Sequence, residues 1–544
     1  MLSETNQDPE SSPTSIFDLI FVKNPNKIPA NAPIYIADAK VLTFGELEYL
    51  IRKCAYNLKE KYNIQKGDVV AIRSFSHIDY PVLVYAIVFV GATVAFIKNT
   101  IDDKIDGITK DLKVVRPKLF IIDFEGWEVS LESAAKAGIS TSHILMFGDS
   151  NLEEGKVECV QNVLLSGENT LSSPYKFTDD ELENYPIYLC YTSGSTGNAK
   201  AVMITTNDAF KTVKNTYPNG RTHSKLLAFK SFHTNSSIMF PLLFSILKGH
   251  QVYISRASTV DEICQGIQEH KISFILGSPY NIASMVLQSE HINKNYDLSS
   301  VNVVRLGGSA ISKDLIKKAT ELFGASIHNP YGATEMVSPF QTTPEISAMG
   351  SIGKLKAGFD IRIVDEDEND TKLGEPGELL VNKSFVTKGY YNNPKETAKM
   401  FTKDGYYRTG DTVRQDENGL FWFVSRCSNL IKCYPTSYYP YETEKVIQTH
   451  PKVFECAVIG IFQKELSCEY ARAYVTLVDE YDDEETKMIV NDILEYANKQ
   501  LSESKQIRCG VIVKKSFERT PTEKIKYSVL KQEAEREQDE DHYE

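Results

Sequence analysis

The amino-acid sequence predicts a mixed α/β protein whose larger part consists of parallel sheets covered by helices. Short apolar, β-branched runs recur between helical patterns and lack polar alternation, so both faces of each strand should be buried. The 544 residues are 42% hydrophobic and 24% charged, which excludes collagen-like, coiled-coil and disordered chains. At about 150 residues per domain, this length predicts three or four structural units.

The βαβ rhythm extends from the N-terminal region to about residue 340. Amphipathic helices are predicted at Phe44–Tyr62 and Leu315–Phe323. The predicted buried strands are Val69–Ile72, Leu119–Ile122, Ile144–Phe147, Ile187–Tyr191, Phe274–Leu276 and Val301–Leu306.

Beyond residue 340 the pattern changes twice. Between Ser351 and Phe423, short alternating strands at Asp360–Val364 and Glu378–Val381 are separated by Gly, Pro, Asn and Asp turn signals, which predicts a small, mostly β subdomain. From about Ser428 a compact α+β unit is expected. Its elements would be helix Tyr441–Thr449, strands Val453–Ile461 and Arg472–Val478, and helix Glu484–Leu501.

One uncharged stretch, Tyr80–Ile97, is long enough to suggest a membrane span. Pro81 near its start and Gly91 inside it favour a buried helix that breaks into a strand, so no transmembrane segment is expected. The net charge of −13 argues against a nucleic-acid partner. The first fifteen residues lack the apolar run of a signal peptide. The nine cysteines form neither a C-x-x-C pair nor a zinc-type cluster, so we expect reduced thiols and a cytoplasmic protein.

The strongest chemical signal is the segment Tyr191–Lys200, which directly follows a predicted strand. It contains two glycines, four hydroxyl side chains and a terminal lysine, a composition suited to wrapping phosphate oxygens. It is not a Walker A loop, because Lys200 is followed by Ala201 and no hydroxyl is placed for Mg²⁺. The alternative interpretation is a flexible Ser/Gly turn.

Three further motifs follow. Asn329–Glu335 combines an aromatic ring, a glycine, a hydroxyl and a carboxylate; Arg408–Asp411 offers a carboxylate that could accept both ribose hydroxyls; and Lys524 lies near the C-terminus. Each has a simpler alternative, namely a turn, a surface β-turn and a solvated lysine.

In this order and spacing, the motifs resemble those of the adenylate-forming superfamily. That group includes acyl-CoA synthetases, 4-coumarate–CoA ligases, beetle luciferases and the adenylation domains of peptide synthetases. The resemblance covers about residues 30–530. It implies a large N-terminal AMP-binding domain (residues 1–427) of two doubly wound parallel sheets plus a small β-barrel. A small mobile lid (residues 428–544) would follow on a hinge at Ser428.

The resemblance also implies roles for individual residues around ATP. Tyr331 would stack on adenine, Thr334 would hydrogen-bond the α-phosphate, Asp411 would bind the ribose, Arg426 would lie by ribose and phosphates, and Glu335 would ligate Mg²⁺. The segments expected to cradle the nucleotide are Thr192, Ser193, Gly194, Ser195, Thr196 and Gly197 with Lys200 at the β- and γ-phosphates, Gly307, Gly308 and Ser309 at adenine, and Asn329, Pro330, Gly332 and Ala333 around Tyr331.

Catalysis would depend on two lysines of the lid and on the border of the acyl site. Lys524 would reach the α-phosphate and the attacking oxygen when the lid closes, and Lys432 would face the site in a second, thioester-forming pose. His233 would border the acyl site. With it, Thr234, Asn235, Gly307 and Met336-Val337 would form the acyl wall.

The implied activity is ATP-dependent ligation of a fatty or aromatic carboxylic acid to CoA, with ATP, Mg²⁺ and CoA as cofactors. The sequence departs from the family pattern at Tyr434-Pro435, which replaces a Lys-Gly pair of the pantetheine tunnel, and at Glu523, which replaces the glycine before Lys524. Two alternatives therefore stay open. The acyl group could pass to a carrier-protein thiol or another acceptor, or the chain could be a nucleotide-binding pseudoenzyme.

Overall fold

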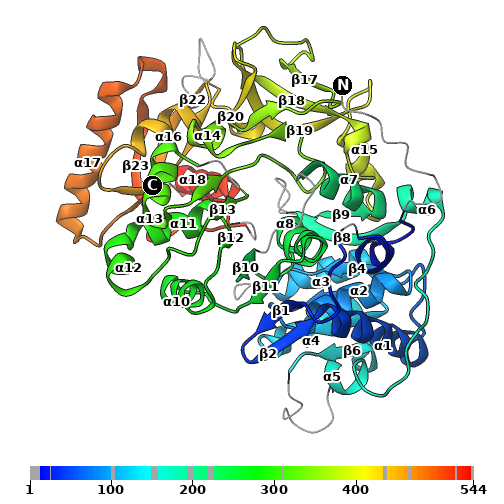
Figure 1. Cartoon of the computed structure of the whole chain (residues 1–544). Coiled ribbons are helices and arrows are strands. Elements are labelled where there is room, and N and C mark those ends of the chain that lie inside the picture. Colours follow the sequence, from blue (N-terminus) through cyan, green and yellow to red (C-terminus); the bar gives the residue numbers. More distant parts are fainter. Residues whose placement is uncertain are drawn as a thin grey trace.

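The computed structural model describes residues 13–24, 26–99, 104–148, 157–192, 200–216, 224–308, 311–432, 438–463, 468–520 and 523–540. Within them the chain forms two seven-stranded sheets, a six-stranded sheet and a three-stranded sheet. Figure 1 shows the succession of these parts along the chain, from the blue N-terminal elements to the red C-terminal helix. The predicted α/β class is confirmed.

The first seven-stranded sheet has the order β7-β6-β5-β3-β4-β8-β9. All neighbours are parallel except β8 and β9, which are antiparallel. Every residue of β3, β4 and β5 is buried, as the uninterrupted apolar runs predict. The strands are β3 (Val69–Arg73), β4 (Thr93–Phe96), β5 (Leu119–Ile122), β6 (Ile144–Met146), β7 (Glu158–Cys159), β8 (Pro186–Thr192) and β9 (Lys200–Thr205).

The second seven-stranded sheet has the order β14-β13-β12-β10-β11-β1-β2. It is parallel except for the β1–β2 hairpin at one edge. Its strands are β1 (Pro33–Ala37), β2 (Lys40–Thr43), β10 (Lys225–Ala228), β11 (Gln251–Ile254), β12 (Phe274–Gly277), β13 (Val303–Leu306) and β14 (Ser326–His328).

Helices cover these sheets, and two of them show how the sequence sets their limits. Helix α1 (Phe44–Tyr62) begins at a capping box in which the Thr43 side chain and Glu46 satisfy each other's backbone N–H groups. The other covering helices include α3 (Ile105–Val115), α4 (Trp127–Ala137), α7 (Thr206–Thr216), α10 (Val260–His270), α11 (Pro279–Leu287), α12 (Ser289–Asn295) and α13 (Lys313–Phe323).

Helix α2 (Tyr80–Phe89) is buried along its whole length. It ends before Gly91. Only glycine fits at this position, because its φ is +85° and the Cβ atom of any other residue would lie 2.8 Å from the Tyr175 ring. The stretch Tyr80–Ile97 therefore is a helix followed by strand β4, as expected. No helix within the described residues is long and apolar enough to cross a membrane.

Polar contacts tie the two parallel sheets together. The carboxylate of Asp123, at the end of β5 and fully buried, lies 3.1 Å from Nη2 of Arg256, which follows β11. It also accepts hydrogen bonds from the Ser74 hydroxyl (2.7 Å) and the Phe75 N–H (3.0 Å). One continuous apolar core includes side chains from both sheets, so the sheets form a single packed body.

The third sheet is antiparallel, with the order β15-β16-β20-β19-β18-β17. We expected a closed β-barrel here, and that expectation was wrong. Among the described residues, the edge strands β15 and β17 do not pair with each other, and β15 has only two residues, so the sheet stays open. Its strands are β15 (Phe340–Gln341), β16 (Gly353–Leu355), β17 (Ile361–Val364), β18 (Gly377–Asn382), β19 (Tyr406–Gln415) and β20 (Leu420–Arg426), with α15 (Pro394–Lys399) between β18 and β19.

The C-terminal unit, residues 438–463, 468–520 and 523–540, has the predicted α+β composition and its own small cores. Figure 1 shows it in orange and red, and its Arg519 contacts Tyr280 of the green helix α11. Its elements are α16 (Pro440–Ile447), β21 (Val453–Gln463), β22 (Cys468–Leu477), α17 (Asp483–Gln500), β23 (Ile507–Val513) and α18 (Tyr527–Glu540).

Candidate nucleotide site

The two ends of the predicted phosphate loop lie opposite each other. Strands β8 and β9 form an antiparallel pair in which Thr192 faces Lys200. The loop residues Ser193, Gly194, Ser195, Thr196 and Gly197 lie outside the described residues. The Lys200 ammonium is 2.6 Å from Oε2 of Glu396 in α15 and 5.0 Å from the centre of the Tyr390 ring.

Tyr390 connects this lysine to the predicted metal ligand. Its hydroxyl donates a 3.0 Å hydrogen bond to Oε1 of Glu335, and the Thr387 N–H donates to the Glu335 carbonyl oxygen at 2.8 Å. Burial raises the pKa of the Glu335 carboxyl. Lys200 and Glu335, 135 positions apart in the sequence, thus contact the same tyrosine.

The donor set around Glu335 can be compared with the needs of a metal ion. Within the described residues, no group of three or more His, Cys, Asp or Glu side chains could hold a metal. A single half-buried carboxylate nevertheless fits Mg²⁺, which keeps several waters and is usually bound through one or two carboxylates plus substrate phosphates.

The β19–β20 hairpin places the predicted ribose-binding carboxylate against two partners. Asp411 and Arg426 face each other in the register of this pair, with Oδ1 of Asp411 3.0 Å from Nε of Arg426. The other carboxylate oxygen accepts a 2.7 Å hydrogen bond from the Tyr331 hydroxyl. Arg426 also donates to the Thr409 carbonyl oxygen at 3.2 Å. Tyr331, Asp411 and Arg426 therefore form one connected cluster.

The C-terminal unit contributes Lys524 to the same place. Its pKa is lowered by burial and by the charge of Arg426, and the charges of Asp411 and Glu335 act in the opposite direction. Residues from the second sheet's end, the β19–β20 hairpin and the C-terminal unit thus surround one polar centre. A cation at this point is suited to stabilising negative charge that develops on a phosphate.

The predicted adenine wall follows β13. The Gly307 N–H donates to the Gly277 carbonyl oxygen at 3.1 Å, and Gly308 has a φ of +103°, a conformation that favours glycine. Ser309 lies outside the described residues. The segment before Tyr331 begins with Asn329, whose N–H donates to the Ser347 hydroxyl at 3.1 Å. Pro330 is half-buried, and Gly332 and Ala333 are exposed and half-buried respectively.

A pocket next to Thr334 collects part of the predicted acyl wall. Thr334, Met336, Val337 and Asn235 all line it, together with Asp208, Thr212, Ile204, Met239, Phe385 and Thr387. Part of the predicted acyl wall therefore shares one cavity with the predicted α-phosphate ligand, whereas Thr234 and Gly307 do not line it.

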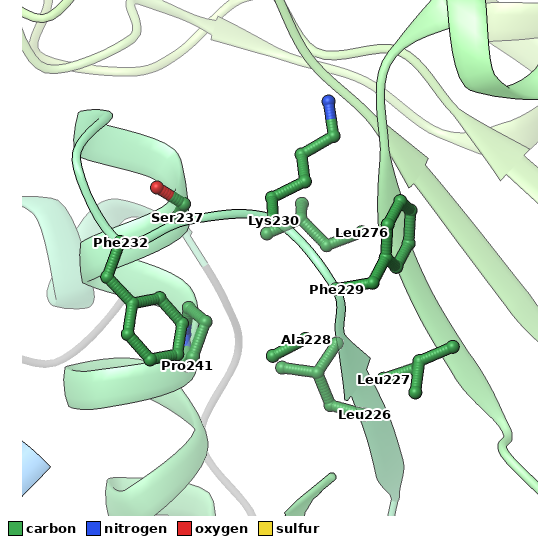
Figure 2. Close-up of a pocket in the computed structure, with 9 residues that line it drawn as sticks. All are labelled: Leu226, Leu227, Ala228, Phe229, Lys230, Phe232, Ser237, Pro241 and Leu276. Atoms are coloured by element: carbon green, nitrogen blue, oxygen red, sulfur yellow. The ribbon is translucent and has the colours of Figure 1, made fainter. Parts of the chain in front are cut away.

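His233 is not among the residues that line this pocket. It precedes Thr234, which caps the short helix α8 (Asn235–Ile238). The preceding residue, Phe232, lines a second, apolar pocket, and Figure 2 shows it there with Pro241 and with Lys230, whose side chain extends away from Leu226 and Leu227. The backbone of Lys432 is bound to Glu469 of strand β22. The Lys432 N–H donates to Oε2 of Glu469, and the Lys432 carbonyl oxygen accepts from the Glu469 N–H, both at 2.8 Å.

Two residues of the centre were not predicted. Tyr390 follows Gly389 in a segment rich in Tyr, Asn and Pro, which indicates only a turn. Glu396 stands three residues after Asn393, where a capping role is the ordinary interpretation. Its carboxylate instead contacts Lys200, and that charge holds the pKa of Glu396 at about 2.

Two family models match the sequence of this chain. The AMP-binding enzyme family matches residues 21–391, and the AMP-binding enzyme C-terminal domain matches residues 442–524. The chain belongs to the AMP-binding enzyme family. Family membership and the site together make it an ATP-dependent ligase of the adenylate-forming superfamily, which forms acyl-adenylates.

Individual relatives are distant but cover most of the chain. The 4-coumarate–CoA ligase-like 3 protein of Arabidopsis thaliana is 25% identical over 479 residues, which is 86% of this chain and 83% of that protein. The crystal structure of the anthranilate CoA ligase AuaEII with anthranoyl-AMP superposes with a TM-score of 0.85 at 19% identity, covering 97% and 99% of the two chains. The amide bond synthetase McbA from Marinactinospora thermotolerans gives 0.77 at 17% identity, covering 92% and 97%. These AMP-binding enzymes share the fold.

Proposed function

We propose that this AMP-binding enzyme is a carboxylate–CoA ligase that makes an acyl-AMP intermediate and then an acyl-CoA thioester. One observation carries the first half of this proposal. Lys524, from the C-terminal unit, is close enough to Arg426, Asp411 and Glu335 for their charges to act on its pKa, and Asp411 and Arg426 are themselves paired. We assign residues 1–427 to the adenylation domain and residues 428–544 to its lid.

The proposed first step joins two anions. A carboxylate oxygen of the acid attacks the α-phosphorus of ATP, the bond from that phosphorus to the bridging oxygen breaks, and pyrophosphate leaves. Negative charge accumulates on the phosphorus oxygens in the transition state. We assign Lys524 and Arg426 to that charge, Thr334 to the α-phosphate, and Lys200 to the β- and γ-phosphates.

The nucleoside would be held by the Tyr331 ring and by Asp411. With one oxygen bound by Arg426 and the other by Tyr331, the Asp411 carboxylate has a fixed orientation before the ribose arrives. Glu335 would hold Mg²⁺, which supplies charge neutralisation at the phosphates. The contact of Lys200 with Glu396 would exchange for a contact with phosphate oxygens when ATP binds.

The proposed second step is attack of the CoA thiolate on the acyl carbonyl, with release of AMP. The names of two similar proteins support CoA as the acceptor, since one is a 4-coumarate–CoA ligase-like protein and the other an anthranilate CoA ligase. Lys432, held within the lid, is the residue we assign to the site in this second pose. His233 would border the acyl group.

The acid is proposed to be fatty or aromatic, and the protein to act in the cytoplasm. Another acceptor is the second candidate, because Tyr434-Pro435 replaces the Lys-Gly pair of the family's pantetheine tunnel. A carrier-protein thiol or an amine would then take the place of CoA. The complete charged set makes a pseudoenzyme the weakest alternative, because such a protein need not keep Lys200, Lys524 and Arg426 together.

Acid-dependent exchange of labelled pyrophosphate into ATP tests the first step. We would screen short, medium, long-chain, aromatic and amino acids without CoA, and then measure AMP release after CoA, a carrier protein or an amine is added. CoA-dependent AMP release with one acid would support the ligase. Exchange without CoA-dependent release would move the assignment to another acceptor, and absence of exchange with every acid would refute adenylation.

A further inference from the structure

The contacts that join the lid to the body gather beside the catalytic lysine. The Lys230 ammonium, at the end of β10, lies 2.6 Å from Oε2 of Glu523, the residue before Lys524. The Asn281 amide donates to the other Glu523 oxygen at 3.3 Å. Nearby, the Arg519 guanidinium lies 4.1 Å from the centre of the Tyr280 ring. One lid carboxylate is thus bound by two side chains of the body.

The body's half of this contact is held in place by its own hydrogen bonds. The Lys230 carbonyl oxygen accepts from the Ser76 hydroxyl at 3.0 Å. The Asn281 Oδ1 atom accepts from the N–H and the hydroxyl of Ser278, at 3.1 and 2.9 Å. Because its oxygen is occupied, Asn281 presents its NH₂ group to the carboxylate. The body therefore offers a cation and an amide donor already oriented for an anion.

The backbone at Glu523 is strained. Its φ is +61°, in the left-handed region where a side chain costs roughly 1 kcal/mol relative to glycine. Two hydrogen bonds fix this conformation: the Glu523 N–H donates to the Thr520 carbonyl oxygen, and the Thr520 N–H donates to the Lys524 carbonyl oxygen, both at 2.8 Å. The turn suits a glycine, and glycine is what the family pattern has there, whereas here the Glu523 side chain contacts Lys230 and Asn281.

The two charges are partly withdrawn from water. The side chains of Lys230 and Glu523 are 27% and 29% exposed. Burial lowers the pKa of Lys230, which the Glu523 charge partly counteracts. Burial alone would raise the pKa of Glu523, but Lys230 and the hydrogen-bond donors outweigh it and the pKa is lowered. Because both side chains are mostly withdrawn from water, the pair is less screened than one on the open surface.

We propose that the Glu523 carboxylate, bound by Lys230 and Asn281, latches the lid in the adenylation pose. Glu523 is a positioning residue: it touches no reacting atom, but it directly precedes Lys524 and fixes where that ammonium lies. Since Lys524 must withdraw before a thiol can enter, the latch favours the first half-reaction over the second. This inference rests on the proposed function for its consequence in catalysis, although the latch itself is a property of the free protein.

The test compares full-length Glu523→Gly, Glu523→Gln and Lys230→Met with the wild type. Gly removes the contact and also relieves the backbone strain, whereas Gln keeps the shape and the Asn281 contact but loses the charge. We expect acid-dependent pyrophosphate exchange to fall roughly 5- to 30-fold in E523G and K230M, and less in E523Q. Thioester formation from supplied acyl-AMP should not fall. The K230M/E523G double variant should lose no more than either single variant.

Glu518→Gln is the matched control, because Glu518 pairs with Lys526 in the same hairpin without reaching the body. Hydrogen exchange of residues 519–526 and of α11 provides a readout that needs no substrate. Faster hydrogen exchange of these residues in E523G and K230M, but not in E518Q, would support the latch even if the enzyme activated none of the acids tested. If hydrogen exchange of these residues in E523G is as slow as in the wild type, the latch is overturned. A wild-type rate of pyrophosphate exchange in E523G would overturn it as well.

Discussion

Asp411→Asn tests the nucleotide site by removing one charge at almost constant shape. The wild-type carboxylate has a side chain only 9% exposed and is bound by Arg426 on one oxygen and Tyr331 on the other. In the variant the amide oxygen can face Arg426, and its NH₂ group can face the phenol oxygen of Tyr331. Arg426 also keeps its bond to the Thr409 carbonyl oxygen. The hydrogen-bond geometry should therefore survive, and the fold with it.

The expected loss appears in ligand binding. A hydrogen bond to a charged acceptor contributes about 1.5–3 kcal/mol, and one to a neutral acceptor about 0.5–1.5 kcal/mol. If the carboxylate accepts from both ribose hydroxyls, replacing it with an amide should cost about 2–3 kcal/mol, or roughly a 30- to 150-fold weaker Kd. Lost pairing with the half-exposed Arg426 adds little, on the order of 0–1 kcal/mol.

Calorimetric titration with AMP measures this Kd without an acid or an acceptor. Asp404→Asn is the control with the same charge change, because Asp404 is 51% exposed and pairs with Arg362 on the surface of the third sheet. Its Kd should equal that of the wild type. AMP binding within twofold of wild type by Asp411→Asn would refute the assignment of the ribose to this carboxylate.

Three other predictions concern the lid and the fold. Lys524→Ala should reduce acid-dependent pyrophosphate exchange at least roughly 100-fold with an unchanged circular dichroism spectrum, and near-normal exchange would contradict its role. Burial raises the pKa of Glu444 to about 7, from 4.5 for a free carboxyl, so the folded state holds a proton between these pH values and stability falls as pH rises through them. Glu444→Gln should accordingly be more stable than wild type above pH 7, by about 3 kcal/mol, and equal to it near pH 4.5. Parallel melting curves across this range would contradict the assignment. Gly353→Ala should destabilise by about 2–4 kcal/mol, since φ is +127° and the new Cβ would lie 2.6 Å from a carbonyl oxygen of β15. At Gly358 (φ +83°) nothing lies within 4 Å, so alanine there should cost only about 1 kcal/mol in urea titrations; equal losses would refute the clash.

Local signals determined most of the secondary structure. Helix Phe44–Tyr62 was predicted with its observed limits from its long amphipathic pattern, and in the structure the Thr43–Glu46 capping box fixes its start. Strand β13 begins at Val303 and not at the predicted Val301, since the Val301 N–H is used in a turn with the Leu298 carbonyl oxygen. The strands themselves were recognisable because buried parallel strands need apolar side chains on both faces.

Contacts between segments that are far apart in the chain could not be predicted from the sequence. The barrel prediction failed because closure depends on how two edge strands meet, which no local pattern encodes. The pairing of Lys200 with Glu396 joins residues 196 positions apart, and a lysine alone indicates only a cation. Glu523 could be recognised as a departure from a family pattern, but its partner Lys230 could not, because surface lysines are common and their ion pairs depend on the folded arrangement.

The ion pair between the buried Asp123 carboxylate and the partly exposed Arg256 guanidinium has a consequence for dissecting the molecule. It joins the ends of strands in two different sheets, and the apolar core continues across the same boundary. We expect neither α/β half to be stable as an excised fragment, because cutting between them would remove the Arg256 partner of Asp123 and open a hydrophobic face to water. We therefore expect the two halves to unfold as one cooperative block.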